Sequence, residues 1–413
     1  MLRPLARVPT FRSVVNRDWR LLWMASHLWH LAFWMDLIVL GWLVLELTDS
    51  PLLVALVGTF RLIPLGVLGP IAGSVGDRIS KKRMLLVAQT VNLLVTIGFT
   101  VVLLLGEERV WLVYAAAVLT GSAWAIDFPV RRAFIRDLLP GRFVVNAMAI
   151  DAASLTGMQM VGRWIGGGIL ALADPGAAYA FLSLCYLVGF FALLRVPERS
   201  TAPSPRVAGA NSLAALVRDL ANGLVYVWRN PVLRNIFLVT VAINLFVAPY
   251  LQITPVFARD VYGVGPGLLG IVSGMDGFGA LVGTIVVASA VGLKRLGRLF
   301  IGGCLLLSFA VTVFSQVPTV WIGIPVMVIV GFGVSGFVTM QTTLSVLHAS
   351  PEMRGRAMGA VALGIGGMPI GMALLGALAE AYGAPRALGM TASLGFLIIL
   401  AIGVFQPALR RAQ

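Results

Sequence analysis

The chain has 413 residues, of which 59% are hydrophobic and only 12% carry a charge. This balance excludes an ordinary soluble globular protein, in which about a quarter of the residues are charged. The formal net charge is +14, but the cations are spread over short segments between long apolar runs. That distribution is typical of topology signals and of contacts with anionic lipid, so we expect a bilayer, and no nucleic acid, as their partner.

Twelve apolar runs approach the length of about 20 residues that a helix needs to cross the hydrocarbon core. In chain order they are residues 20–46, 52–72, 84–105, 110–126, 145–172, 176–194, 235–258, 267–291, 299–316, 319–345, 357–381 and 387–405. With the N-terminus inside, 26 of the 31 Lys and Arg residues fall on cytoplasmic segments. The exceptions are Arg109, Arg259 and Arg386 outside, and Arg61 and Arg163 within runs. The positive-inside rule therefore predicts an all-α integral membrane protein with twelve transmembrane helices and both termini in the cytoplasm.

The loop after the second run, GSVGDRISKKR at residues 73–83, combines a positive cluster with one acid. The positive-inside rule alone explains the cations of this loop. A carboxylate beside a membrane is costly without a partner, so we expect Asp77 to have one. The matching segment of the second half, residues 288–298, keeps Lys294 and Arg295 and has no acid. We infer a duplicated positive anchor and a single latch centred on Asp77.

Residues 197–230 form the one long polar segment between runs. Its first part, residues 197–209, is rich in Pro, Ser and Ala and predicts a flexible linker. Behind Asn211 or Ser212 as a cap, apolar residues at helical spacing predict an amphipathic helix on the inner surface. These apolar residues are Leu213, Leu216, Val217, Leu220, Leu224 and Val227. The predicted domains are a six-helix bundle over 1–196, this linker over 197–230, and a second six-helix bundle over 231–413.

The two halves also look like distant copies. An offset of 215 aligns Pro51 with Pro266 and Arg61 with Asp276, and an offset of 210 aligns residues 147–149 with 357–359. Because such matches keep their order along six spans per half, they indicate two pseudo-symmetric bundles related by a parallel repeat, as in transporters.

Several motifs of the chain resemble those of a known transporter family. The loop at 73–83 is similar to the loop between spans two and three of the major facilitator superfamily, with Gly73, Asp77, Arg78 and Lys81–Lys82 in matching positions and Ser80 replacing the usual glycine. Further segments resemble the bacterial enterobactin-exporter, macrolide-efflux and lysophospholipid-transporter group of that superfamily. They are GWLVLELTDSPL (41–52), RLIP (61–64), DFPVRRAFIRDLLP (127–140) and PEMRGRAMG (351–359).

The resemblance implies alternating access in a bacterial cytoplasmic (inner) membrane, with spans three, six, nine and twelve on the outside of the bundles. It also implies that Asp77 closes the cytoplasmic side by contacts with Arg131 or Arg132 and with the start of span eleven after Arg354 and Arg356. One segment departs from the family. Where a proline is expected in span five, the run from Gly162 has Arg163, which cannot supply the kink associated with antiport.

Four charged residues lie well inside predicted spans: Asp36, Arg61, Arg163 and Asp276. A charge at mid-bilayer costs at least about 2.5–3.5 kcal/mol on insertion scales, so such residues indicate function or pairing. Asp36 and Arg61 form a bridge in one interpretation. Asp276 either reaches Arg61 or Arg163 as an interhelix lock or binds a proton or cation. Desolvation favours the neutral form of a buried carboxylate, so Asp36 and Asp276 are the candidates for proton coupling.

Arg163 shares one helical face with Thr156 and Gln159 and is the first candidate for an anionic or polar substrate group, because guanidinium binds carboxylate or phosphate bidentately. Snorkelling of Arg163 to the outer surface is the alternative. On span ten, Ser335, Thr339 and Thr342 form a weaker polar stripe, whose hydroxyls either face a cavity, as we predict for Thr339, or pack between helices.

No feature of the chain predicts an enzyme, a cofactor or a metal site. His27 and His30 have a spacing that could hold a metal, but no carboxylate or thiol joins their face. The three lysines never follow glycine, so there is no phosphate-binding loop, and H-E-x-x-H and G-x-S-x-G are absent from the sequence.

The sequence therefore predicts a monomeric secondary active exporter of a hydrophobic or amphiphilic small molecule, driven by an ion gradient and most simply by protons. A lysophospholipid flippase-like carrier or uniporter is the alternative, and a non-transporting membrane receptor is a remote one.

Overall fold

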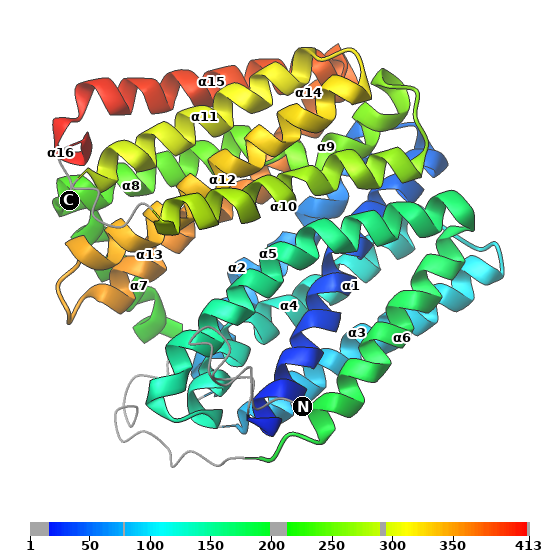
Figure 1. The fold of residues 1–413 in the computed structure, drawn as a ribbon, viewed down its shortest axis with the longest axis horizontal. Coiled ribbons are helices and arrows are strands. Elements are labelled where there is room, and N and C mark those ends of the chain that lie inside the picture. Colours follow the sequence, from blue (N-terminus) through cyan, green and yellow to red (C-terminus); the bar gives the residue numbers. More distant parts are fainter. Residues whose placement is uncertain (1–15, 77–78, 199–212, 290–294, 411–413) are drawn as a thin grey trace. The chain divides into compact units, whose positions relative to one another are not determined.

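The computed structural model describes residues 16–76, 79–198, 213–289 and 295–410, and every regular element in them is a helix. The first half contains α1 (Arg17–Thr48), α2 (Pro51–Gly76), α3 (Lys81–Leu104), α4 (Val110–Leu138), α5 (Gly141–Leu172) and α6 (Pro175–Leu194) (Figure 1). The second half begins with α7 (Leu213–Arg229), α8 (Pro231–Ala242), η4 (Ile243–Val247), α9 (Tyr250–Val256), η5 (Phe257–Val261) and α10 (Pro266–Ser289). It ends with α11 (Leu296–Gln316), α12 (Val320–His348), α13 (Arg354–Leu363), η6 (Gly364–Gly366), α14 (Gly367–Tyr382), α15 (Ala384–Phe405) and α16 (Pro407–Arg410).

The chain divides into two compact units. Unit 1 comprises Met1–Leu40 and Phe60–Gly209, and unit 2 comprises Gly41–Thr59 and Ala210–Gln413. The sequence predicts that the first set of six spans ends at residue 196 and that the second begins at residue 231, and both boundaries stay predictions. We call the end of unit 1 that carries the start of α1 its inner end, since the sequence predicts that this end faces the cytoplasm.

Ten helices of the described residues are long and apolar enough to cross a membrane. The two other predicted spans, 52–72 and 145–172, coincide with the continuous helices α2 and α5 and are not among these ten. A lipid-embedded chain must satisfy its backbone hydrogen bonds internally, which is why the apolar runs become helices. Ten spans are supported, and the count of twelve with cytoplasmic termini stays a prediction.

Span seven is not the single regular helix that the apolar run 235–258 suggests. It contains two π-helical segments, η4 and η5, and a proline within or beside each of its regular parts. Pro249 has no N–H, so the carbonyl of Leu245 loses its usual partner four residues on, and Ala248 instead donates to Ile243 over 2.8 Å. On α14, Gly371 fits against the carbonyl of Leu245, where a Cβ would clash. Such widened turns are frequent at functional sites.

The turn between α1 and α2 belongs to unit 2 because its polar groups bind helices of that unit. Arg259 of η5 donates to the carboxylate of Asp49 over 2.7 Å and to the carbonyl of Leu45 over 2.9 Å. Glu380 of α14 accepts from the hydroxyl of Ser50 over 2.8 Å and from the N–H of Leu52 over 3.2 Å. The carboxylate of Glu380 therefore caps the start of α2.

Amphipathic helix α7 is present where the sequence predicts it, while its predicted caps Asn211 and Ser212 lie outside the described residues. In unit 2 it packs against α13 and the preceding turn. Gly223 fits against the carbonyl of Arg356, and the hydroxyl of Tyr226 accepts from the N–H of Ser350 over 3.0 Å. Val225 and Trp228 are exposed, as expected for a helix that lies on a membrane surface.

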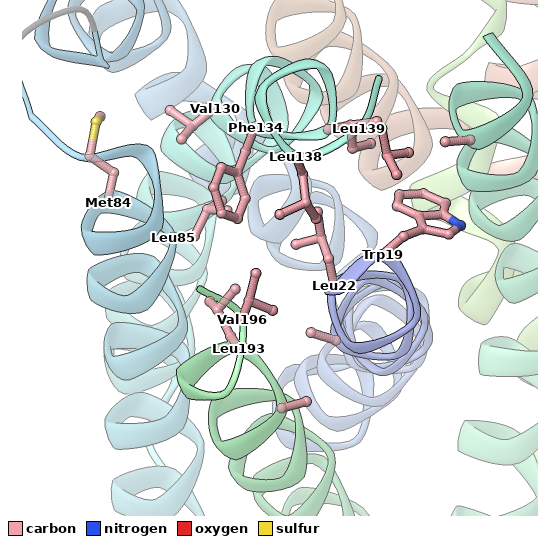
Figure 2. Close-up of a cluster of buried hydrophobic side chains, with 14 of the residues drawn as sticks. Trp19, Leu22, Met84, Leu85, Val130, Phe134, Leu138, Leu139, Leu193 and Val196 are labelled. Carbon is pink, nitrogen blue, oxygen red and sulfur yellow. The ribbon is translucent and has the colours of Figure 1, made fainter. Parts of the chain in front are cut away.

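An apolar cluster closes the inner end of unit 1. Figure 2 shows side chains of α1, α3, α4 and the end of α6 converging there. Its large buried members include Trp19 and Leu22 of α1, Phe134 and Leu138 of α4, and Leu193 of α6. This packing fixes the relative positions of the inner parts of α1 and α4, which carry the polar groups described below.

Candidate functional site

In unit 1, Asp36 of α1 and Arg61 of α2 form a buried ion pair. Arg61 Nη1 lies 2.7 Å from Asp36 Oδ2, so the pairing interpretation of the sequence is the one that the geometry supports. Tyr179 of α6 completes the site, because its hydroxyl donates to Asp36 Oδ1 over 2.5 Å. The guanidinium also lies 4.3 Å from the centroid of the Phe33 ring. Both oxygens of Asp36 are thus satisfied in a site from which solvent is excluded.

In unit 2, Asp276 of α10 is fully buried, and Tyr250 of α9 donates to its Oδ2 atom over 2.9 Å. The offset of 215 that aligns Arg61 with Asp276 is close to the 214 residues that separate Asp36 from Tyr250. The two halves therefore place a polar contact between corresponding helices at corresponding levels. Sequence reasoning missed both tyrosines, because an aromatic residue in an apolar run has no feature that distinguishes it from core.

Backbone packing repeats this symmetry. Gly121 of α4 fits against the carbonyl of Arg61, and Gly331 of α12 fits against the carbonyl of Asp276; in both places a Cβ would clash with the backbone. Small residues allow transmembrane helices to approach closely. The charged residues thus lie where two helices cross at very short range in each unit, which supports the internal repeat.

Arg163 of α5 is 1% exposed, and its guanidinium lies 4.7 Å from the centroid of the Trp34 ring on α1. It therefore lies inside unit 1 rather than snorkelling to a surface. The neighbouring glycines Gly162 and Gly166 pack against the α1 backbone, so this part of α5 is a helix contact. Gln159 is half-buried on the same helix.

The polar stripe of α12 is mostly satisfied by its own helix. The hydroxyl of Ser335 donates to the Phe332 carbonyl over 2.8 Å, and the exposed hydroxyl of Thr342 donates to the Val338 carbonyl over 3.1 Å. Thr339 is half-buried, so its role as a cavity residue stays a prediction.

A second group of buried polar residues lies nearer the inner end of unit 1. This inner polar network consists of Ser26, Asp127, Arg131 and Asp151. Arg131 binds Asp127 with two nitrogens, Nε at 2.8 Å and Nη2 at 2.6 Å, and donates through Nη1 to Ser26 Oγ at 2.9 Å. Asp151 of α5 lies close enough for the hydroxyl of Ser26 and the charges of Arg131 and Asp127 to act on its carboxyl group.

Sequence reasoning missed this network because it ended span four at residue 126. Helix α4 continues to Leu138, and the charges that look like a loop are paired along or beside it. Asp127 and Arg131 are four residues apart and face each other on one side of the helix. Asp137 contacts Lys81 of α3. The spacing of four between Asp127 and Arg131 was the signal that could have revealed the helix.

The predicted latch is described only in part. Asp77 and Arg78 lie outside the described residues, and Gly73 stands near the end of α2. Arg131 gives its donors to the inner polar network, whereas the exposed Arg132 stacks on Phe128 at 4.0 Å. The remaining predicted members, Arg354 and Arg356, are exposed at the start of α13.

Beside the start of α3, Glu198 follows α6 and is exposed. A hydrogen bond from the hydroxyl of Ser80, and then the charges of Arg83 and Lys82, lower the pKa of the Glu198 carboxyl below its ordinary value. Arg83 Nε lies 3.2 Å from Glu198 Oε1. These contacts tie the inner ends of α3 and α6 together.

Membrane-length helices, a repeated helix crossing and buried charges at membrane depth together define a multi-span membrane transporter made of two related halves. A sequence profile described as transmembrane secretion effector, from the major facilitator superfamily, matches residues 9–412. The chain therefore belongs to the transmembrane secretion effector family of that superfamily.

The relatives agree with this membership. The chain is 26% identical to the multidrug efflux pump Tap of Mycolicibacterium fortuitum, over 91% of this chain and 92% of that protein. It is 23% identical to the staphyloferrin A transporter of Staphylococcus aureus, over 88% of this chain and 89% of that protein. Among solved structures, the nucleoside transporter NupG superposes with a TM-score of 0.72 at 14% identity, covering 94% of this chain and 98% of that one. The last likeness concerns the fold alone.

Proposed function

We propose that this protein is a secondary active exporter of a hydrophobic or amphiphilic small molecule, driven by a proton gradient across a bacterial inner membrane. The observation that carries the proposal is the pair of corresponding buried contacts, Asp36 with Arg61 and Asp276 with Tyr250. Charged residues within spans are costly and mark substrate or ion pathways in transporters. The two relatives, a multidrug efflux pump and a staphyloferrin A transporter, support the substrate class.

The energy of a proton gradient suffices for this task. Moving one charge across 100 mV yields about 2.3 kcal/mol, and a tenfold solute gradient costs about 1.4 kcal/mol. The residues that we propose to line the transport pathway are Asp36, Arg61, Gln159, Arg163, Asp276 and Thr339. Asp36 and Asp276 are the proton-binding candidates that the sequence predicts.

The transport cycle that we propose is alternating access by a monomer with two six-helix bundles, 1–196 and 231–413. Rocking of two repeats about a central site is the usual arrangement in such folds. The latch that would close the cytoplasmic side comprises Gly73, Asp77, Arg78, Arg131, Arg132, Arg354 and Arg356.

Transport in proteoliposomes tests the proposal. Purified protein is reconstituted and given ethidium, a cationic amphiphilic dye, with an imposed pH gradient. We expect dye movement against its gradient that stops when a protonophore is added. Transport that ignores the protonophore contradicts the proton-driven part of the proposal. Full coupling in the double variant Asp36→Asn with Asp276→Asn excludes these two residues as the proton-binding groups.

A lysophospholipid carrier is the second candidate, and Arg163 favours it. A buried guanidinium beside the Trp34 ring suits a phosphate head group with an apolar tail. Movement of a fluorescent lysophospholipid between leaflets, measured in the same proteoliposomes without ethidium transport, would favour this candidate over drug export.

A further inference from the structure

We propose that Asp151 of α5 is the residue that binds and releases the coupling proton. The inference rests on the proposed function, since it names the ion-binding group of the same export cycle. Asp36 and Asp276 stay the candidates predicted from the sequence, and the contacts of the buried acids favour Asp151 over both.

Four carboxylates are buried among the described residues, and they differ in how completely they are paired. Three accept the short hydrogen bonds given above: Asp36, Asp127 and Asp276. Asp151 is 7% exposed, yet its Oδ1 atom has no hydrogen-bond partner within the described part of the chain. A buried acceptor without a donor costs about 1–3 kcal/mol, and more when it is charged. A proton on this carboxyl group removes the charge at the place where the protein supplies no donor.

The hydrogen bonds that Arg131 forms near Asp151 go to other residues. The charged and titratable groups that act on Asp151 come from α1 and α4 and are His27, Asp127, Arg131 and Arg132. Arg131 directs Nε and Nη2 at Asp127 and Nη1 at Ser26. These three hydrogen bonds of the Arg131 guanidinium go to Asp127 and Ser26, so none of them reaches Asp151.

The charge balance of the network points the same way. With both carboxylates ionised, Asp127 and Asp151 bring two negative charges against the single fully buried cation, Arg131. Arg132 also acts on Asp151, but its side chain is exposed beside Phe128, so solvent reduces the effect of its charge. A single proton on Asp151 makes the buried network neutral. Losing and regaining that proton is therefore the smallest change that alters the charge of this region, and burial disfavours the charged form.

The position of Asp151 along α5 suits exchange with one side of the membrane. It lies roughly 15 Å along the helix from Gly141, the first residue of α5. The preceding residue, Ile150, is a buried member of the apolar cluster at the inner end of unit 1. The next residues, Ala152 and Ala153, are exposed. Asp151 therefore lies beside an exposed edge of α5, from which a proton could reach its carboxyl group.

The test separates coupling from transport itself. Asp151→Asn, Asp151→Glu and wild-type protein are reconstituted and given ethidium, with and without an imposed gradient of one pH unit. That gradient corresponds to about 1.4 kcal/mol per proton and supports up to about tenfold accumulation. We expect wild type and Asp151→Glu to accumulate dye, and Asp151→Asn to equilibrate it without accumulation, a loss of up to about tenfold. Asp174→Asn is the matched control, since Asp174 caps α6 outside the network and asparagine caps equally well.

Each result of these experiments either supports or overturns the assignment of Asp151. Wild-type accumulation in Asp151→Asn overturns the assignment and leaves the proposed function standing, as does loss of coupling in Asp36→Asn or Asp276→Asn alone. Wild-type protein that responds to a sodium gradient and not to pH overturns both. If Asp151→Asn does not fold, infrared pH titration of wild type and Asp151→Glu replaces it. We then expect a protonated carboxyl band that shifts in Asp151→Glu, and an unshifted band contradicts the assignment.

Discussion

Tyr250 donates a hydrogen bond to Asp276 over 2.9 Å, at the level where the first half of the chain joins Asp36 to Arg61. The first unit thus uses an ion pair where the second uses a phenol and a carboxylate. The position of the contact has been kept between the halves while its charge has changed. We therefore expect the two contacts to respond differently to substitution.

Asp36→Asn should destabilise the protein by about 3–5 kcal/mol, because it leaves the charge of Arg61 buried without compensation. Tyr250→Phe should cost less, about 1.5–3 kcal/mol, since it removes one hydrogen bond to a charged group. Denaturant unfolding in detergent measures both. The control is Asp36→Asn combined with Arg61→Met, which removes both charges and should recover much of the loss. Equal destabilisation of the single and the double variant would show that the unpaired charge of Arg61 is not the cause of the loss.

Gly121→Ala and Gly331→Ala should each cost about 1–3 kcal/mol, because the added methyl meets a backbone carbonyl that cannot move aside. Gly302 on α11 is the matched control, as nothing lies within 4 Å of its Cβ position. Alanine there should be neutral or stabilising by up to about 1 kcal/mol, through its higher helix propensity. Similar melting temperatures for all three variants would contradict the close helix crossings.

Much of the fold follows from the sequence for a simple physical reason. A chain in lipid must form helices, so long apolar runs and the bias of Lys and Arg residues suffice to place the spans. The pairing of Asp36 with Arg61 could also be predicted, because two opposite charges on adjacent spans have few other partners. The repeat offset then located the corresponding position, Asp276, in the second half.

What the sequence could not show depends on packing. The π-helical turns of span seven follow from Pro249 only together with Gly371, whose fit against the Leu245 carbonyl is a tertiary contact. The inner polar network was missed because charges were read as the end of a span, whereas Asp127 neutralises Arg131 one turn away and lets α4 continue.

Glu380→Ala should lower stability by about 0.5–2 kcal/mol, the usual effect of removing a helix cap. The carboxylate of Glu380 accepts from the hydroxyl of Ser50 and from the N–H of Leu52 at the start of α2. Glu380→Gln keeps an acceptor and should lose less. Hydrogen exchange of the first turn of α2 measures the effect locally, and unchanged protection in Glu380→Ala would exclude the cap.

Glu198 should make the stability of the folded protein depend on pH in the acid range. Its pKa in the folded protein is lowered from an ordinary value of 4.5, first by the hydroxyl of Ser80 and then by Arg83. Stability from this group is therefore present above about pH 4.5 and is lost as the pH falls through the folded pKa. Proteolysis near residue 198 should rise at acid pH in wild type. Glu198→Gln should remove that pH dependence, and a pH profile equal to that of wild type contradicts the contact.

Arg163→Lys should weaken binding of an anionic amphiphile, such as a fluorescent lysophospholipid, by about 0.5–2 kcal/mol. The charge is kept, but the flat guanidinium that lies 4.7 Å from the Trp34 ring is lost, and with it bidentate binding and stacking. Trp34→Phe keeps a ring and should lose less. Arg109→Lys is the matched control, because Arg109 is exposed and forms a surface ion pair with the nearby Glu107. Fluorescence titration of the purified variants measures the affinities. If Arg163→Lys binds the lipid as wild type does while Arg163→Gln no longer folds, then Arg163 serves the packing of α1 against α5 and does not select the substrate.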